Sequence, residues 1–177
     1  YFGVNFLFHS HRFTPEESRD NIIVPKDNDA TDKTAMENKQ ILDEMTMVLW
    51  SFLEANVHTW ANTIKMASLH IKDKGYSEDK TEKYYKELKE SWVREFSKLR
   101  LIDVKGERFC MDDAPHPVVL ESSLEAFISE QSDIDYLSVI YPYAIGKASV
   151  PCKEELLQWS RIIAEWNPVK SENFLTL

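Results

Sequence analysis

The chain has 177 residues, of which 43% are hydrophobic and 12% aromatic, enough for a packed core in one large domain or two small ones. Asp and Glu number 30 against 21 Lys and Arg, and the formal charge of −9 argues against nucleic acid and against a polybasic membrane anchor, since both need surplus cations. The 4 glycines are scattered, which excludes most glycine-rich nucleotide loops.

The cellular location is predicted from the cysteines and from the lack of targeting segments. No signal-peptide pattern is visible, and no apolar run approaches the roughly 18 residues of a membrane helix. Cys110 and Cys152 are far apart and lie in no paired motif, which favours a reduced, cytoplasmic protein. A secreted protein whose signal has been removed is the alternative.

The first nine residues, Tyr1–His9, are apolar on both faces of an extended chain. We expect a strand here, either an edge strand under helices or the last strand of an upstream domain. A polar, proline-containing stretch follows, in which Ile22–Val24 forms a short strand or a plug. We therefore assign residues 1–33 to an N-terminal strand and loop, and residues 34–177 to a helical domain.

Helical spacing begins at Thr34 and continues to about Lys72 without Gly or Pro, which predicts one long helix or two with a kink near Asn56. Its apolar stripe contains Ile41, Met45, Val48, Leu49, Phe52 and Leu53. Lys74–Gly75 is a stop signal, and Ser77 is a candidate N-cap for the next helix.

The segment 99–111 is predicted to be a hairpin, because apolar residues flank Lys105–Gly106. A loop over 112–117 and short helices near 120–128 and 134–143 follow. Pro151 lies at the first turn of a last helix that stops at Asn167–Pro168, before a tail over 170–177. The predicted fold is thus mainly α, with a small β-hairpin and an N-terminal strand.

No catalytic or metal-binding motif stands out. His9 and His11 share a face of an extended chain, but no cysteine or carboxylate cluster with ligand spacing lies nearby. Cys152 lies in the first turn of a helix, where a thiol pKa is lowered, yet no histidine partner can be assigned to it. No Gly-x-Ser-x-Gly, Walker loop or Gly-x-Gly-x-x-Gly is present, so we assign no catalytic residue and no metal site.

Five tryptophans lie on the predicted apolar stripes: Trp50, Trp60, Trp92, Trp159 and Trp166. A core of packed aromatic helices explains them. The alternative is an exposed aromatic patch that docks a partner, for which Trp159 and Trp166 near the C-terminus are the candidates.

Two segments resemble a known family. Val4–Phe6, Arg12–Phe13, Arg19 and Ile22–Val24 are similar to the segment that closes the ATPase fold in the sacsin-like branch of the gyrase, heat-shock chaperone and histidine-kinase (GHKL) superfamily. Leu101–Phe109 resembles the glycine hairpin that recurs after the long helix of such proteins. The nucleotide motifs of the superfamily, an Asn-bearing helix and Asp-x-Gly-x-Gly, are absent from this chain.

The resemblance implies a non-catalytic segment that transmits nucleotide state or acts as a scaffold downstream of an ATP-binding domain. ATP and Mg²⁺ would belong to the parent protein, and the partner would be the upstream ATPase domain or another protein. Arg12 and Arg19 match the positions of a phosphate-contacting basic residue, although loop salt bridges with Glu16, Glu17 or Asp20 also explain them. The alternative function is a free-standing helical module that binds another protein.

Overall fold

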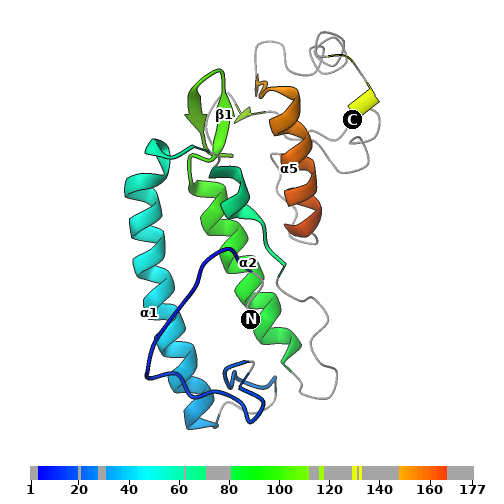
Figure 1. The fold of residues 1–177 in the computed structure, drawn as a ribbon. Coiled ribbons are helices and arrows are strands. Elements are labelled where there is room, and N and C mark those ends of the chain that lie inside the picture. Colours follow the sequence, from blue (N-terminus) through cyan, green and yellow to red (C-terminus); the bar gives the residue numbers. More distant parts are fainter. Residues whose placement is uncertain are drawn as a thin grey trace.

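The computed structural model describes residues 4–19, 21–27, 31–61, 63–70, 81–111, 116–117, 129–130, 132 and 148–166. Three helices stand alongside one another: α1 (Lys33–Asn56), α2 (Glu82–Lys98) and α5 (Lys153–Trp166). In Figure 1 a small hairpin, β1 (Ile102–Val104) and β2 (Glu107–Phe109), lies at the end where α1 and α2 finish. The mainly α fold with a small hairpin is confirmed.

Several expectations concern residues outside the described ranges. They are the stop at Lys74–Gly75, the N-cap Ser77, most of the loop 112–117, the helices near 120–128 and 134–143, and the tail from residue 170. A short parallel pair of β3 (His116–Pro117) and β4 (Ala148–Ser149) was not predicted.

Helix α1 begins at a side-chain cap and ends earlier than the apolar pattern. The Asp32 carboxylate accepts a hydrogen bond from the Ala35 amide at 3.1 Å. At the other end the Asn56 side chain donates to the Phe52 carbonyl, and the Thr59 hydroxyl donates to the Asn56 carbonyl. The Asn56 carbonyl is the acceptor that the Trp60 amide would need in a further helical turn, and the Trp60 amide donates to the Val57 carbonyl instead. The chain therefore continues in two short 3-10 turns, η1 (Val57–Thr59) and η2 (Thr63–Ala67).

The hairpin follows the sequence signal closely. Lys105 and Gly106 both have positive φ, 56° and 89°, as a two-residue type I′ turn requires. The Asp103 carboxylate accepts from the Gly106 amide at 2.9 Å and holds the turn. The antiparallel register pairs Ile102 with Phe109.

Large aromatic side chains bring the three helices together. Trp166 of α5 stacks on Phe96 of α2, with ring centroids 6.4 Å apart and an interplanar angle of 15°. Trp50 of α1 meets Trp92 and Phe96 of α2 edge-on at 4.8 and 5.1 Å. The main core therefore lies between the helices and beneath the hairpin.

The N-terminal segment differs from the predicted strand. Among residues 4–9, only Val4 forms a β-bridge, with Leu69. Phe6 and Phe8 turn inward onto Trp92, whereas Leu7 is 95% exposed. The segment is extended, but its apolar side chains pack on helices and not within a sheet.

The loop that follows is held by one buried amide. Asn38 of α1 accepts from the Thr14 amide at 2.9 Å and donates to the carbonyls of Thr14 and Ile23, each at 2.8 Å. Val24 is buried beside Leu42 and Tyr84, so Ile22–Val24 acts as a plug, with only an isolated bridge from Ile22 to Pro15.

Candidate functional site

The structure places the two candidate arginines on an exposed loop. Arg12 and Arg19 are both solvent-exposed, and Arg19 adopts a positive φ of 60°. Neither guanidinium forms an ion pair within the described ranges, and the expected pairs with Glu16 or Glu17 are not formed. Asp20 lies outside the described residues.

The two candidate tryptophans lie in the core. Trp159 and Trp166 are fully buried and meet edge-to-face at 6.0 Å. The Trp166 indole donates to the Ala67 carbonyl at 2.8 Å. Packing explains both residues, and the exposed-patch interpretation was wrong for them because neither indole reaches the surface.

An exposed apolar patch lies instead on α1. Met47 is 69% exposed, Val48 71% and Phe52 51%. Val48 and Phe52 were expected in the buried stripe, but Leu42 and Leu53 take the buried positions and turn these two outward. We call Met47, Val48 and Phe52 the outer patch of α1.

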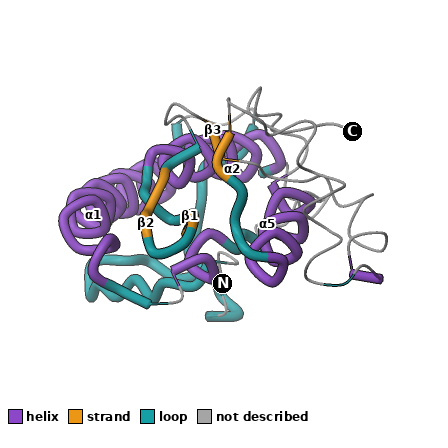
Figure 2. The backbone as a smooth tube through the Cα atoms, turned by 90° about the horizontal axis from the view of Figure 1, so that it is seen from above, coloured by secondary structure: helices purple, strands orange, loops and turns teal. Residues whose placement is uncertain are grey.

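The position of α1 explains why the outer patch is uncovered. Seen from above in Figure 2, α1 lies at one edge of the described fold, with α2 and the hairpin between it and α5. One side of α1 packs on α2 through Trp50, and the N-terminal loop is fixed to it through Asn38. Phe52 contacts the half-buried Trp60 at 5.6 Å, which connects the patch to the core.

The charges around the outer patch have one sign. Glu44 lies one turn before Met47 and Val48, Glu54 lies two residues after Phe52, and both carboxylates are exposed. The sequence from residue 40 to residue 64 contains no Lys or Arg. The last turn of α1 accordingly carries no basic residue.

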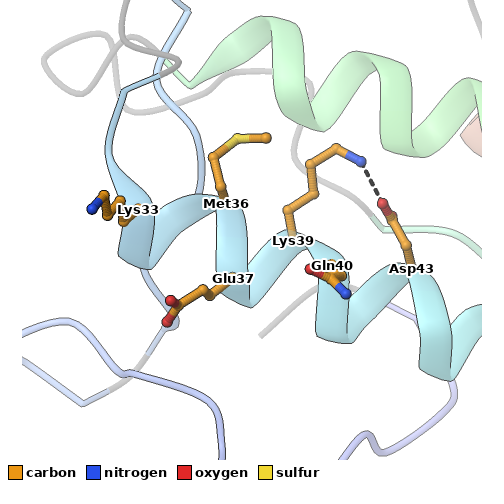
Figure 3. A pocket seen from close by; sticks show the side chains of 6 residues that line it. All are labelled: Lys33, Met36, Glu37, Lys39, Gln40 and Asp43. Carbon is orange, nitrogen blue, oxygen red and sulfur yellow. Dashed lines mark hydrogen bonds and ion pairs between the residues drawn. The ribbon is translucent and has the colours of Figure 1, made fainter.

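The other half of α1 borders a hollow of about 370 Å³, drawn in Figure 3. Met36, Lys39 and Asp43 project toward α2, whereas Glu37 projects away. Lys39 pairs with Asp43 at 2.5 Å, one helical turn apart, so both charges are already partnered within the helix.

A narrower cleft of about 140 Å³ continues between α1 and α2 and reaches Tyr84. The buried Tyr84 hydroxyl has no hydrogen-bond partner in the structure. Burial, followed by the nearby Asp43 carboxylate, raises the pKa of Tyr84 far above its usual value, so this phenol stays neutral. Because its oxygen is sealed from solvent, Tyr84 itself offers no polar contact to a ligand in this cleft.

A second hollow, of about 330 Å³, lies between the hairpin and α5. Arg108 lines one wall, and most of its five N–H groups have partners: it donates to the Thr63 hydroxyl and the carbonyls of Leu101 and Trp60, and pairs with Asp103 at 3.2 Å. With these partners the Arg108 guanidinium connects the hairpin to η2 and has few N–H groups left to donate to a ligand.

Glu155 forms the opposite wall of this hollow. Its carboxylate accepts from the Asp103 amide at 2.7 Å and from the Trp159 indole at 3.4 Å. Burial raises the pKa of Glu155, only partly offset by these bonds. Burial, with Glu154 and Glu155 nearby, also raises the pKa of Cys152, contrary to the lowered value expected at a helix N-terminus. The thiol lies directly before α5, and its raised pKa favours the protonated form over the thiolate.

A third polar group joins η2 to the end of α5. Glu165 accepts from the Ser68 hydroxyl at 2.7 Å and from the Leu69 amide at 3.0 Å, and His70 lies 3.7 Å away. A nucleophilic triad needs the carboxylate on the far ring nitrogen of the histidine. Here Ser68 and Glu165 both approach the Nε2 atom of His70, so the group acts as a clamp.

Comparison with known proteins adds no relative: no family model, curated protein or solved structure matches this chain. Within the described residues, no three His, Cys, Asp or Glu side chains are grouped so as to hold a metal ion. None of the described helices is both long and apolar enough to cross a membrane.

Proposed function

We propose that this chain is a non-catalytic helical module that binds another protein through the outer patch of α1. The observation that carries the proposal is the exposure of Met47, Val48 and Phe52 on consecutive turns of one helix. Val48 and Phe52 are four residues apart and so lie on one face of the helix, as the side chains that anchor a helix to a partner do, and Met47 is next to Val48 in sequence. Single exposed apolar residues are ordinary, but a cluster of three large ones marks an interaction surface.

Burial of the outer patch would supply part of the binding energy of a complex. Full burial of a large apolar side chain is worth about 1.5–3 kcal/mol. Since Met47, Val48 and Phe52 each still expose half or more of their surface, covering them yields about 1–2 kcal/mol apiece, before ordering costs. The half-buried Trp60 beside Phe52 gives the patch a fixed base.

The polar groups support a non-catalytic role. The hydrogen bonds of three polar side chains connect separate segments of the fold; these residues are Arg108, Glu155 and Glu165. The Cys152 thiol has a raised pKa, which disfavours a nucleophile.

A narrower version of the proposal is the transducer or scaffold segment of a larger GHKL-type ATPase. It is supported by the exposure of Arg12 and Arg19, whose guanidinium groups form no ion pair within the described ranges and are therefore accessible to a phosphate from outside the chain. The packing of Phe6 and Phe8 onto Trp92 removes one reason for expecting an upstream sheet. In this version ATP and Mg²⁺ bind the parent protein, and the isolated chain neither binds ATP tightly nor hydrolyses it; measured turnover would refute the non-catalytic role.

The direct test is selection of a displayed peptide library against the chain, with parallel selection against Met47→Ser. The matched control is Met36→Ser, because Met36 is 44% exposed on the same helix, 11 residues or about 16 Å away. We expect enriched peptides to lose binding to Met47→Ser and to keep binding to Met36→Ser. Peptides that bind all three proteins equally, or no enrichment at all, would contradict the proposal.

A further inference from the structure

The charge around the outer patch specifies the chemistry of the partner. Resting on the proposed function, we infer that the partner segment is a basic amphipathic helix whose Lys or Arg residues flank an apolar face. Its apolar side chains cover Met47, Val48 and Phe52, and its cations meet Glu44 and Glu54 at the two ends of the patch.

Two exposed carboxylates flank the outer patch along α1. Glu44 precedes Met47 by three residues and Val48 by four, so it lies directly beside both on the helix surface. Glu54 follows Met47 by seven residues, two turns along the same side. The apolar patch thus has an exposed acid before it and another after it along α1, about three helical turns apart, a pattern that complements cations at a similar spacing on a partner helix.

No Lys or Arg between residues 40 and 64 compensates the charge of these two carboxylates. The nearest lysines in sequence are Lys39, which is paired with Asp43, and Lys65, beyond the end of the helix, and no arginine lies between them. Among the described residues, Glu44 accepts a hydrogen bond only from the neutral Gln40 amide, at 2.9 Å. The long-range field of a chain with a formal charge of −9 acts in the same direction and speeds the approach of a cationic partner.

The C-terminal end of α1 also favours a cation on the partner. The last turn of a helix presents partial negative charge, which natural helices commonly offset with Lys, Arg or His. The last turn of α1 has no basic residue and carries Glu54. A partner cation at this position would interact favourably with the carboxylate and with the helix terminus together.

The same charges disfavour a second copy of this chain as the occupant. A two-fold contact places identical patches against each other, and an antiparallel pairing of the helices sets Glu44 of one copy against Glu54 of the other. Like charges across an interface oppose association. A partner of opposite charge removes this penalty.

The inference is tested with two synthetic helical peptides of about 16 residues. Both carry the same Leu and Phe residues at positions i, i+3, i+4 and i+7. One carries Lys at the flanking positions and the other Glu. Dissociation constants for the full chain are measured by fluorescence anisotropy at about 50 mM and about 300 mM salt.

We expect the Lys peptide to bind at least about tenfold more tightly than the Glu peptide at low salt, with the difference shrinking at high salt. Glu44→Lys and Glu54→Lys should each weaken the Lys peptide about fivefold, since attraction between exposed charges becomes repulsion. The matched control is Glu17→Lys, which makes the same charge change on the exposed N-terminal loop and should alter binding less than about twofold.

Three results would overturn the inference. Tighter or equal binding of the Glu peptide would show that the partner is not basic. If neither peptide binds, the inference that a basic amphipathic helix docks on the patch is also wrong. A dimer of the free chain in sedimentation, dispersed by Met47→Ser, would identify a second copy as the occupant. In each case the library selection still decides separately whether the outer patch binds protein at all.

Discussion

Replacement of Trp166 by phenylalanine tests the packing that joins α5 to the other helices. The residue is fully buried, its ring stacks on Phe96, and its indole N–H donates to the Ala67 carbonyl at 2.8 Å. Trp166→Phe keeps an aromatic ring against Phe96 but removes the N–H and part of the ring volume. The Ala67 carbonyl then loses its indole donor within the core.

The magnitude follows from two contributions. Loss of the donor to a buried carbonyl costs about 1–3 kcal/mol. The space left by the smaller ring adds roughly 1 kcal/mol. Trp166→Phe should therefore lower the free energy of unfolding by about 2–4 kcal/mol. Because domains of this size are stable by about 5–15 kcal/mol, the variant should remain folded.

The assay is urea denaturation of the full chain followed by circular dichroism, with the free energy taken from midpoint and slope. The matched control is Phe52→Ala, which truncates an aromatic residue that is half exposed on α1. Phe52→Ala should cost clearly less than Trp166→Phe, because much of its ring already faces water. Equal losses for the two variants, or a loss below about 0.5 kcal/mol for Trp166→Phe, would refute this description of the core.

Three further changes test the polar connections. Asn38→Ala leaves the Thr14 and Ile23 backbone groups without their side-chain partner and should cost at least about 1–3 kcal/mol in urea denaturation. Glu165→Ala removes the acceptor of the Leu69 amide and should cost about 1–3 kcal/mol in the same assay. Glu155→Gln keeps an acceptor oxygen for the Asp103 amide but removes the charge, and should raise stability at pH 7 relative to the original chain.

The sign of the Glu155 effect follows from proton linkage. Burial raises the pKa of Glu155 in the folded state above its ordinary value of 4.5, so the folded chain holds this proton more tightly than the unfolded chain. Ionisation therefore opposes folding, and stability falls as the pH rises from about 4.5 through the raised pKa. The advantage of Glu155→Gln should shrink toward pH 4.5; an advantage that does not change with pH would contradict the assignment.

The matched control for Asn38→Ala is Gln40→Ala, on the same helix but exposed, whose side-chain amide donates to Glu44. It should change the free energy of unfolding by less than about 0.5 kcal/mol. For Glu165→Ala the control is Glu154→Ala, an exposed carboxylate at the opposite end of α5. If either control loses as much free energy of unfolding as the variant that it matches, the buried hydrogen bonds are not what stabilises the fold.

Local sequence signals predicted the elements whose geometry is local. Lys105–Gly106 supplied the two positive φ angles of the hairpin turn, and no other segment was needed to form it. The N-terminal strand was wrong because the two apolar faces of Tyr1–His9 do not reveal what lies opposite them. The rings of Phe6 and Phe8 pack on Trp92, a residue far along the chain, and do not pack on a neighbouring strand.

The candidate site was missed for a related reason. Val48 and Phe52 were assigned to one buried stripe together with Leu53, although Val48 and Leu53 lie about 140° apart around the helix. Which of them remain exposed depends on where α2 and the N-terminal loop pack. Two sequence signals were available: the excess width of the stripe, and the absence of Lys and Arg from residue 40 to residue 64. The hydrogen bonds from Arg108 to Thr63 and Trp60 join residues 45 and 48 positions apart in sequence, and so left no local signal.

The central claim, that the outer patch of α1 docks a basic helix, is tested most directly by nuclear magnetic resonance. The amide and methyl signals of the labelled chain are followed as the Lys peptide is added. The account predicts that the largest shifts fall on Glu44, Met47, Val48, Phe52 and Glu54. Shifts centred on Trp159, on the hollow beside Lys39 or on Arg12 and Arg19, with the patch unchanged, would contradict it.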